Sequence, residues 1–319
     1  MKRLLLTLRP LSAFGSRPEA GMLFGQLCCS IGLLFGRGRL DALLEGYCGQ
    51  RPFAVLSDAM PAGCVPLPTV PLFSWVPTES SLEERKRWKK MRWMAVEGVK
   101  EAPGRWHRFV RTDGELCGDA VFSQRADVMH NTIRRDSLTT GTGQFAPYQK
   151  TAVFYSPQAR LEIHADIDET RISAQDFVAA MRTMGQMGFG ADASAGLGKF
   201  DIESVKELEP ETAPSRFYLA LSAFVPQGLH LEATGSYYRT QTYFGRHGGE
   251  RVFGASPFKR PLLLAATGAL IDCGSEKRLH WIGRGINGHS VYADTVHQGY
   301  AVVIPLTQWS ASETPVVAG

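Results

Sequence analysis

The stretch Gly188-Phe-Gly-Ala-Asp-Ala-Ser-Ala-Gly-Leu-Gly-Lys-Phe200 contains four glycines within eleven consecutive positions. Glycine lacks a Cβ atom, so such a loop can bring backbone N–H groups close to phosphates and can adopt conformations that other residues avoid. Before the loop, Phe177, Met181 and Met184 recur at helical spacing. After it, Phe200 and Ile202 alternate with polar residues as in a strand. The sequence therefore predicts a helix, a glycine-rich loop and a strand, in that order.

This order excludes two well-known phosphate-binding loops. A P-loop needs the pattern G-x-x-x-x-G-K-[ST], but Gly198-Lys199 is followed by Phe200, and position 193 is alanine. A dinucleotide-binding fingerprint needs a strand before the loop and a helix after it, which is the reverse of the order here. The alternative to a binding role is a tight connection between helix and strand.

The elements upstream extend this order to a fold. They give the sequence strand, helix, insertion, hairpin, helix, loop, strand, which is the split β-α-β-β-α-β pattern of a ferredoxin-like fold. The proline-rich segment 60–78 predicts an extended loop, because proline lacks the donor that sheets and helix interiors need. The expected elements are a strand at Leu4–Leu8, helices at Ala20–Phe35, Leu40–Tyr47 and Ser173–Gln186, and a hairpin of Thr151–Tyr155 with Leu161–Ile167.

Two segments do not belong to this pattern. Residues 118–148 lose hydrophobic periodicity, which predicts a long irregular excursion, and such insertions are usually functional or mobile. The basic stretch Arg85–Arg92 predicts a helix. A solvated face beside a partly buried Trp88 explains that stretch as well as a binding role does.

The second half predicts a strand-rich, helix-poor domain. The charged, proline-containing segment 207–215 is a candidate linker between domains 1–206 and 216–319. The fold class is therefore α+β with two domains. Strands are expected at Phe217–Phe224, Leu262–Ile271 and Tyr300–Pro305, separated by loops at Gly245–Gly249 and Gly283–Gly288.

Bulk properties place few limits on function. The 319 residues are 44% hydrophobic and carry a formal charge of +4, which permits a polyanionic partner without requiring one. The best apolar run, Met22–Phe35, is about 14 residues and is shorter than the roughly 20 needed to span a bilayer. The six cysteines show no C-x-x-C spacing, and Cys28 and Cys29 are expected in the core. Free thiols and the lack of an export signal predict a cytoplasmic protein.

Further motifs along the chain resemble one family. The helix, glycine loop and strand order resembles the carboxy-terminal glycine-rich loop of the RAMP superfamily of CRISPR proteins. Within it, the shared order of motifs is similar to that of the subunits that hold the guide RNA 5′ end in type III-A (Csm) complexes. The supporting stretches are Met22–Leu27, Asp41–Leu44, Leu56–Pro61, Val65–Pro68, His130–Arg134 with Thr139–Gly143, Tyr243–Gly249, and Val291-Tyr to Ala301 with Ile304-Pro305.

The resemblance implies two ferredoxin-like (RAMP- or RRM-like) domains and a division of roles. The glycine loop and the entry to the first helix would line a groove for the repeat-derived 5′ handle, and an insertion at about 118–150 would act as a thumb. Relatives carry basic residues where this loop has Ala191-Asp192. The RNA-binding residues implied are Arg17, Gly21, His130, Asn131, Arg134, Arg135, Gly188, Gly190, Ser194, Gly196, Gly198 and Lys199.

The same resemblance implies partners. They would be the handle of the CRISPR RNA, the repeated backbone subunit and the large polymerase-like subunit, with target RNA nearby and no membrane. No cofactor, metal or catalytic residue is expected, so the chain would be a non-enzymatic subunit. Target cutting and nucleotide synthesis would belong to the neighbouring subunits.

Two other functions remain open. A metal-independent endoribonuclease that processes precursor guide RNA would need a positioned proton acceptor and donor, commonly His with Lys or Tyr. The eight histidines form no recognisable constellation, and His164 is expected to point to solvent from its strand. Asp166 and Asp168 could share a face and bind a metal, although a charged strand end explains them more simply. A scaffold without RNA contact is the third possibility.

Overall fold

An antiparallel sheet organises the first half of the chain. In the computed structural model, which describes residues 1–310 except 78, 119, 210–212, 249–250, 252–253 and 255, its strand order is β10-β1-β9-β2. The central strand β1 (Lys2–Pro10) pairs with β10 (Phe200–Leu208) on one side and with β9 (Leu161–Ile167) on the other. β9 also pairs with β2 (Ala54–Leu56) and with the two-residue β3 (Met60–Pro61).

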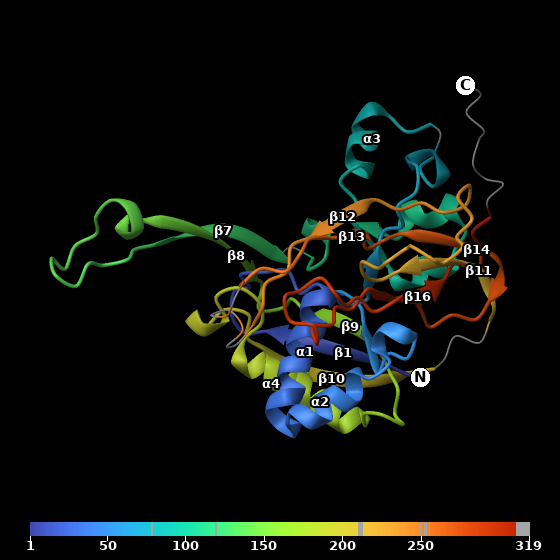
Figure 1. Cartoon of the computed structure of the whole chain (residues 1–319). Helices are drawn as coiled ribbons and strands as arrows, with labels where there is room; N and C mark the ends of the chain where they lie inside the picture. Colours follow the sequence, from blue (N-terminus) through green and yellow to red (C-terminus); the bar gives the residue numbers. More distant parts are fainter. Residues whose placement is uncertain are drawn as a thin grey trace.

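Helices cover one face of this sheet. α1 (Ala20–Phe35) and α4 (Ala174–Met187) pack against each other, and α2 (Arg37–Leu44) follows α1 after a turn at Gly36, which has φ +86° (Figure 1). The apolar faces of α1 and α4 meet the leucines of β1, which point to one side because strand side chains alternate.

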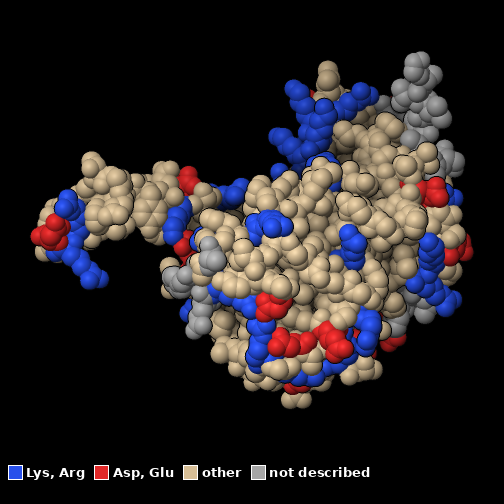
Figure 2. Space-filling model, in the orientation of Figure 1, with Lys and Arg blue, Asp and Glu red and all other residues tan. Residues whose placement is uncertain are grey.

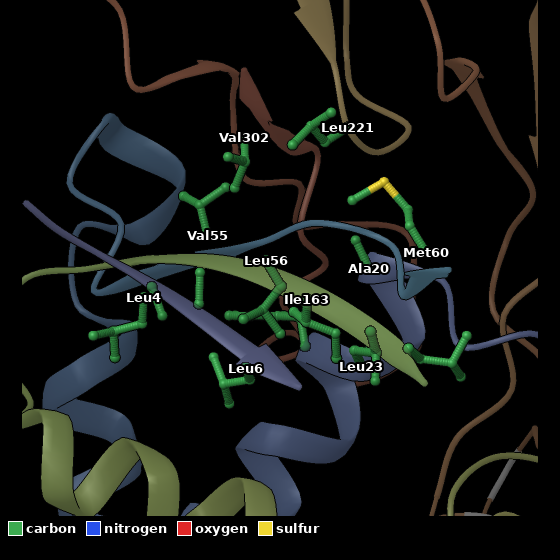
Figure 3. Packing of buried hydrophobic residues seen from close by; sticks show 14 of the residues in the cluster. Leu4, Leu6, Ala20, Leu23, Val55, Leu56, Met60, Ile163, Leu221 and Val302 are labelled. Atoms are coloured by element: carbon green, nitrogen blue, oxygen red, sulfur yellow. The ribbon is translucent and has the colours of Figure 1, made fainter. Parts of the chain in front are cut away.

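The second half of the chain covers the opposite face. Its main sheet has the order β14-β11-β16-β15, and the described part of this half contains no α-helix. Figure 3 shows Val55 of β2 directed toward Val302 of β16, whereas Leu6 lies on the helix side. The strands are β11 (Ser215–Ala220), β14 (Leu270–Lys277), β15 (Trp281–Gly283), β16 (Tyr300–Pro305) and a separate pair, β12 (Thr240–Tyr243) with β13 (Leu262–Ala265).

Two insertions leave this layered body between β3 and β9. The first contains α3 (Leu82–Trp88) and a small sheet in the order β4-β5-β6. The second is a hairpin of β7 (Ser123–His130) and β8 (Tyr148–Tyr155), which projects far from the body (Figure 1). The small sheet consists of Cys64–Pro66, Trp93–Ala95 and Val110–Arg111. Single 3₁₀ turns lie at Tyr47–Gly49, Leu72–Ser74, Val96–Lys100, Pro103–Arg108, Asp113–Glu115, Gly143–Phe145 and Ala193–Ala195.

Much of the predicted element pattern is confirmed, including the α+β class with antiparallel sheets. α1 and β16 have the predicted bounds, and α4 begins one residue after Ser173, whose Oγ accepts a hydrogen bond from the Asp176 N–H at 3.0 Å. None of the described helices is both long and apolar enough to cross a bilayer. Gly249 and residues 210–212, which the predicted loop and linker include, lie outside the described residues.

The predicted hairpin of Thr151–Tyr155 with Leu161–Ile167 is wrong. β8 pairs with β7 over eight residue pairs, from Ser123–Tyr155 to His130–Tyr148. β9 has β1 on one edge and β2 and β3 on the other, so it has no free edge for β8. The segment that lacked periodicity therefore contains a regular strand. Its side chains alternate between two exposed faces, so no apolar face marks it in the sequence.

Three smaller expectations also fail. The predicted strand Leu262–Ile271 is two strands, because the chain turns at Gly268, where φ is +85°. The strand expected at Phe217–Phe224 ends at Ala220. His164 is buried, because β9 is a central strand covered on both faces, and Cys29 is exposed on α1.

Candidate nucleic-acid interface

Three segments that are distant in sequence meet at one place on the first half. They are the connection between β1 and α1, the glycine-rich loop 188–199, and the base of the β7–β8 hairpin. Phe14 and Val153 exchange backbone hydrogen bonds of 2.8 and 2.9 Å, and the Gly198 N–H donates to the Ala13 carbonyl at 2.7 Å. The Phe14 ring contacts Tyr155 edge-on, with ring centroids 5.4 Å apart. The hairpin and the loop are therefore attached to the same short connection.

The glycine-rich loop is built by close backbone approach. Gly188 and Gly198 have φ values of +93° and +72°, and both are buried. A Cβ on Gly198 would lie 2.0 Å from the Phe189 carbonyl oxygen, and one on Gly188 would lie 2.5 Å from that of Leu197. These two glycines hold the two ends of the loop together. The tight connection considered as an alternative therefore accounts for them.

Several N–H groups of the loop are already bonded within the protein. The Gly190 N–H donates to the Gln26 side chain of α1 at 3.2 Å, and the Ala191 N–H donates to Ser16 Oγ at 3.1 Å. The open part of the loop lies further along, where Ser194 is exposed and a Cβ on Gly196 would meet nothing within 4 Å. Any contact with a phosphate falls mainly on this part, 193–197.

The charge around the loop is positive, but one acid reduces it. Lys199 and Arg17 are exposed, and neither makes an ion pair within the described residues. Asp192, in the left-handed conformation, binds Lys150 Nζ of β8 at 2.5 Å. This ion pair joins the loop to the hairpin and raises the pKa of Lys150 through the hydrogen bond to Asp192. Figure 2 shows basic side chains both where the hairpin joins the body and at its far end.

The hairpin carries exposed apolar and aromatic side chains along its length. His130, at the end of β7, stacks on Tyr148 of β8 with ring centroids 5.5 Å apart and planes at 16°. Aromatic faces of this kind are what proteins use to stack splayed bases. The exposed large side chains here are Val128, Met129, Ile133, Leu138, Tyr148 and Phe154.

The tip of the hairpin presents two arginines in different states. Arg134 binds Asp136 at 2.9 Å and lies over the Phe145 ring at 5.6 Å, so its charge is partly compensated. Arg135 is exposed and has no ion-pair partner among the described residues. Asn131 is exposed as well. The structure thus divides the predicted site residues into a tip group, on the hairpin, and a base group, at the glycine loop.

Gly21 belongs to neither group. Its Cβ would lie 2.4 Å from the His297 ring, so this position is where α1 packs closely against the second half. Beside it lies a cavity of about 20 Å³ lined in part by Glu19, Asp58 and Tyr243. Asp58 accepts hydrogen bonds from the Ala20 N–H at 2.8 Å and from Thr267 Oγ1 at 2.5 Å, and burial raises its pKa to about 7.

Sequence reasoning missed Lys150 and the His130–Tyr148 stack as parts of this surface. The strand that places Lys150 and Tyr148 was assigned to a different hairpin, and without the correct partner strand their position could not be found. The alternation of exposed and half-buried positions in 123–130 is too weak a signal to reveal that partner.

The described residues show no acid–base or metal constellation of the kind that hydrolysis needs. Burial lowers the pKa of His164 to about 4 and that of His297 to about 3, so both are neutral at pH 7. Asp166 is fully buried and paired with Arg3, so it does not share an open face with Asp168. Within residues 1–310, apart from the gaps in their description, no group of three His, Cys, Asp or Glu side chains is arranged to hold a metal ion.

Comparison with known proteins identifies the fold. No protein-family profile and no curated protein matches the sequence. Among solved structures, a chain of the Csm1-Csm4 cassette in complex with AMPPNP is similar with a TM-score of 0.59 and 17% identity, over 96% of this chain and 98% of that one. A chain of the Csm3-Csm4 subcomplex of the type III-A CRISPR-Cas interference complex has a TM-score of 0.60 and 13% identity, over 96% and 99%. Csm4 is common to both assemblies, and this chain shares its fold along nearly the full length.

Proposed function

We propose that this chain is the RNA-organising subunit of a type III-A CRISPR ribonucleoprotein and holds the repeat-derived 5′ handle of the CRISPR RNA. The observation that carries the proposal is the junction of a projecting hairpin with a glycine-rich loop on one RAMP-like body. The full-length likeness to chains from the Csm1-Csm4 and Csm3-Csm4 assemblies supports this assignment. The order β10-β1-β9-β2 with α1 and α4 on one face supports a ferredoxin-like first domain.

The base group would hold the phosphates of the handle. Lys199 and Arg17 supply positive charge beside the open part of the loop at Ser194 and Gly196. The buried Gly188 and Gly198 keep this part in place, although they do not face the RNA. Because Asp192 engages Lys150, Lys150 contributes to positioning the hairpin more than to neutralising phosphate.

The tip group would act where the handle gives way to the guide sequence. A strand whose bases are splayed apart can stack on the His130–Tyr148 pair and on the exposed apolar side chains of the hairpin. Arg135 would contact a phosphate, and Asn131 would read a base edge or a 2′-hydroxyl. Arg134 can take part by exchanging its contact with Asp136 for one with the RNA.

The chain would bridge two protein partners as well. The solved assemblies with the same fold pair Csm4 with Csm1 and with Csm3. By analogy, this chain would sit between the large subunit and the repeated backbone subunit. It would act as a non-catalytic component, since its buried histidines are held neutral and away from the hairpin.

Binding of labelled repeat RNA to the purified chain tests this function. We expect binding without cleavage, and Arg134→Ala/Arg135→Ala together with Lys199→Ala should weaken it at least about tenfold through lost phosphate contacts. Arg278→Ala and Lys277→Ala, on the second half, provide the matched control. Cleavage of the repeat at one position would instead identify a guide-processing ribonuclease, and unchanged binding by the variants would exclude the proposed site.

A further inference from the structure

The most cationic stretch of the chain lies outside the proposed handle site. Between Arg85 and Arg92, six of eight residues are Lys or Arg and none is acidic. All six are exposed. Figure 2 shows a basic cluster over α3, well separated from the hairpin. The hairpin and the glycine loop use none of these residues, so the cluster needs its own explanation.

The scaffold beneath this cluster is specifically built. A helix of seven residues has little stability in isolation. Here Ser81 and Glu84 form a reciprocal capping box at its start, with the Ser81 N–H donating to Glu84 at 2.7 Å. At its end, Trp88 packs edge-on against the buried Trp75, with ring centroids 5.8 Å apart, and against His107. The cations are therefore presented from an anchored helix.

Few acidic groups compensate the charge. Arg87 binds Glu115 at 2.8 Å, and Glu84 is engaged at the helix start. Lys86, Lys89 and Lys90 form no ion pair within the described part of the chain. Residues three and four apart on a helix have Cβ atoms about 5–6 Å apart, so these lysines form one compact group.

The composition of the cluster favours nucleic acid over protein. Lysine is depleted in the buried parts of protein interfaces, where arginine and aromatic residues are enriched. Solvated protein surfaces usually intersperse the two signs of charge, whereas this stretch contains only one. A row of lysines without acids instead suits the phosphates of a polyanion, which are bound through charge and counterion release.

We infer that the α3 lysine surface, defined as Lys86, Lys89, Lys90 and Arg92, binds the phosphate backbone of an RNA strand independently of its sequence. This is a second RNA contact, separate from the handle site. It gives the chain a grip on RNA that does not derive from the repeat.

The test uses the full chain and a fluorescein-labelled single-stranded RNA of 30 nucleotides without repeat sequence. The dissociation constant is measured at several salt concentrations for the wild type and for Lys86→Gln/Lys89→Gln/Lys90→Gln. Each phosphate contact on a single strand contributes about 0.7 to the slope of log affinity against log salt, so we expect the slope to fall by about 2. Affinity near 0.1 M salt should fall at least about tenfold. The three lysines are exposed, so the thermal midpoint should stay the same.

The matched control removes the same charge elsewhere. Lys206→Gln/Lys277→Gln/Arg278→Gln alters exposed cations on β10 and on the second half, and it should change the affinity less than about twofold. Equal losses in both variants would show a general effect of net charge and overturn the inference. An unchanged slope in the α3 variant would also overturn it, and loss of a protein partner alone would assign the surface to a protein interface. Because the probe lacks the repeat, none of these outcomes depends on the handle site.

Discussion

Gly198 and Gly196 show that glycines of one loop have different roles. Both have positive φ, +72° and +92°, so alanine is strained at either position. Only at Gly198 would a Cβ also meet backbone atoms, whereas the space around Gly196 is open. The sequence shows a dense group of glycines, but it cannot show which of them the fold requires, because that depends on backbone approach between distant residues.

We therefore expect Gly198→Ala to lower the free energy of unfolding by about 3 kcal/mol or more, and Gly196→Ala by only about 1–2 kcal/mol. Urea denaturation of the two variants measures the difference. Equal losses would show that conformational strain, and not the contact with Phe189, decides the role of Gly198.

Buried histidines predict how stability depends on pH. Burial lowers the pKa of His164 and His289 to about 4 and that of His297 to about 3, from 6.5. The charged groups that face them are Arg3 for His164, and Lys259 and His247 for the other two. The unfolded chain therefore binds protons at these sites below pH 6.5, while the folded chain does not, so stability falls as the pH drops.

Asp58 acts in the opposite direction but does not cancel this effect. Its pKa of about 7 means that the folded chain keeps a proton that the unfolded chain releases above pH 3.8. Three histidines outweigh one carboxyl group, so the thermal midpoint should fall steadily from about pH 6.5 to about pH 4. His297→Gln should flatten this profile. A midpoint that stays constant over this range would contradict the burial of the histidines.

At the scale of elements, the hairpin is an addition to a body that does not depend on it. β7 and β8 pair only with each other, apart from the Phe14–Val153 contact at the base. The sequence located this insertion near 118–150, but it assigned β8 to the wrong partner. Apolar alternation predicts a strand and the face it buries, whereas it does not specify which neighbour completes the pairing.

Replacing residues 131–147 by a short Gly-Ser turn tests this independence. The body buries none of these side chains, so the thermal midpoint should change by less than about 2 °C. Binding of repeat RNA should fall at least about tenfold, because the tip group is removed. Fluorescence anisotropy gives the affinity. A large loss of stability would mean that the tip packs on the body in solution.

At the scale of the whole molecule, the two halves share one core. Arg3 of β1 forms two 2.7 Å hydrogen bonds to the buried Asp166 of β9, and its guanidinium also donates to the carbonyls of Val303 and His280 in the second half. From the sequence alone, Lys2-Arg3 was only a charged start before a strand. Its burial arises from the second half covering the sheet, which no local pattern predicts.

Removing one member of this pair should destabilise both halves together. We expect Arg3→Met to cost about 3–5 kcal/mol, since Asp166 is left as an uncompensated buried charge. The double variant Arg3→Met/Asp166→Leu should recover much of that loss. Urea denaturation followed by tryptophan fluorescence and by circular dichroism should give one transition for both probes. Two separate transitions would show that the halves unfold independently.

The central claim is that the hairpin and the glycine loop hold the repeat-derived end of a guide RNA. Ultraviolet crosslinking of the assembled complex, followed by sequencing of the RNA 5′ ends bound to this chain, tests it directly. The account predicts one uniform repeat-derived segment at those ends, crosslinked within residues 123–155 and 188–199. Random 5′ ends, or crosslinks confined to other surfaces, would contradict it.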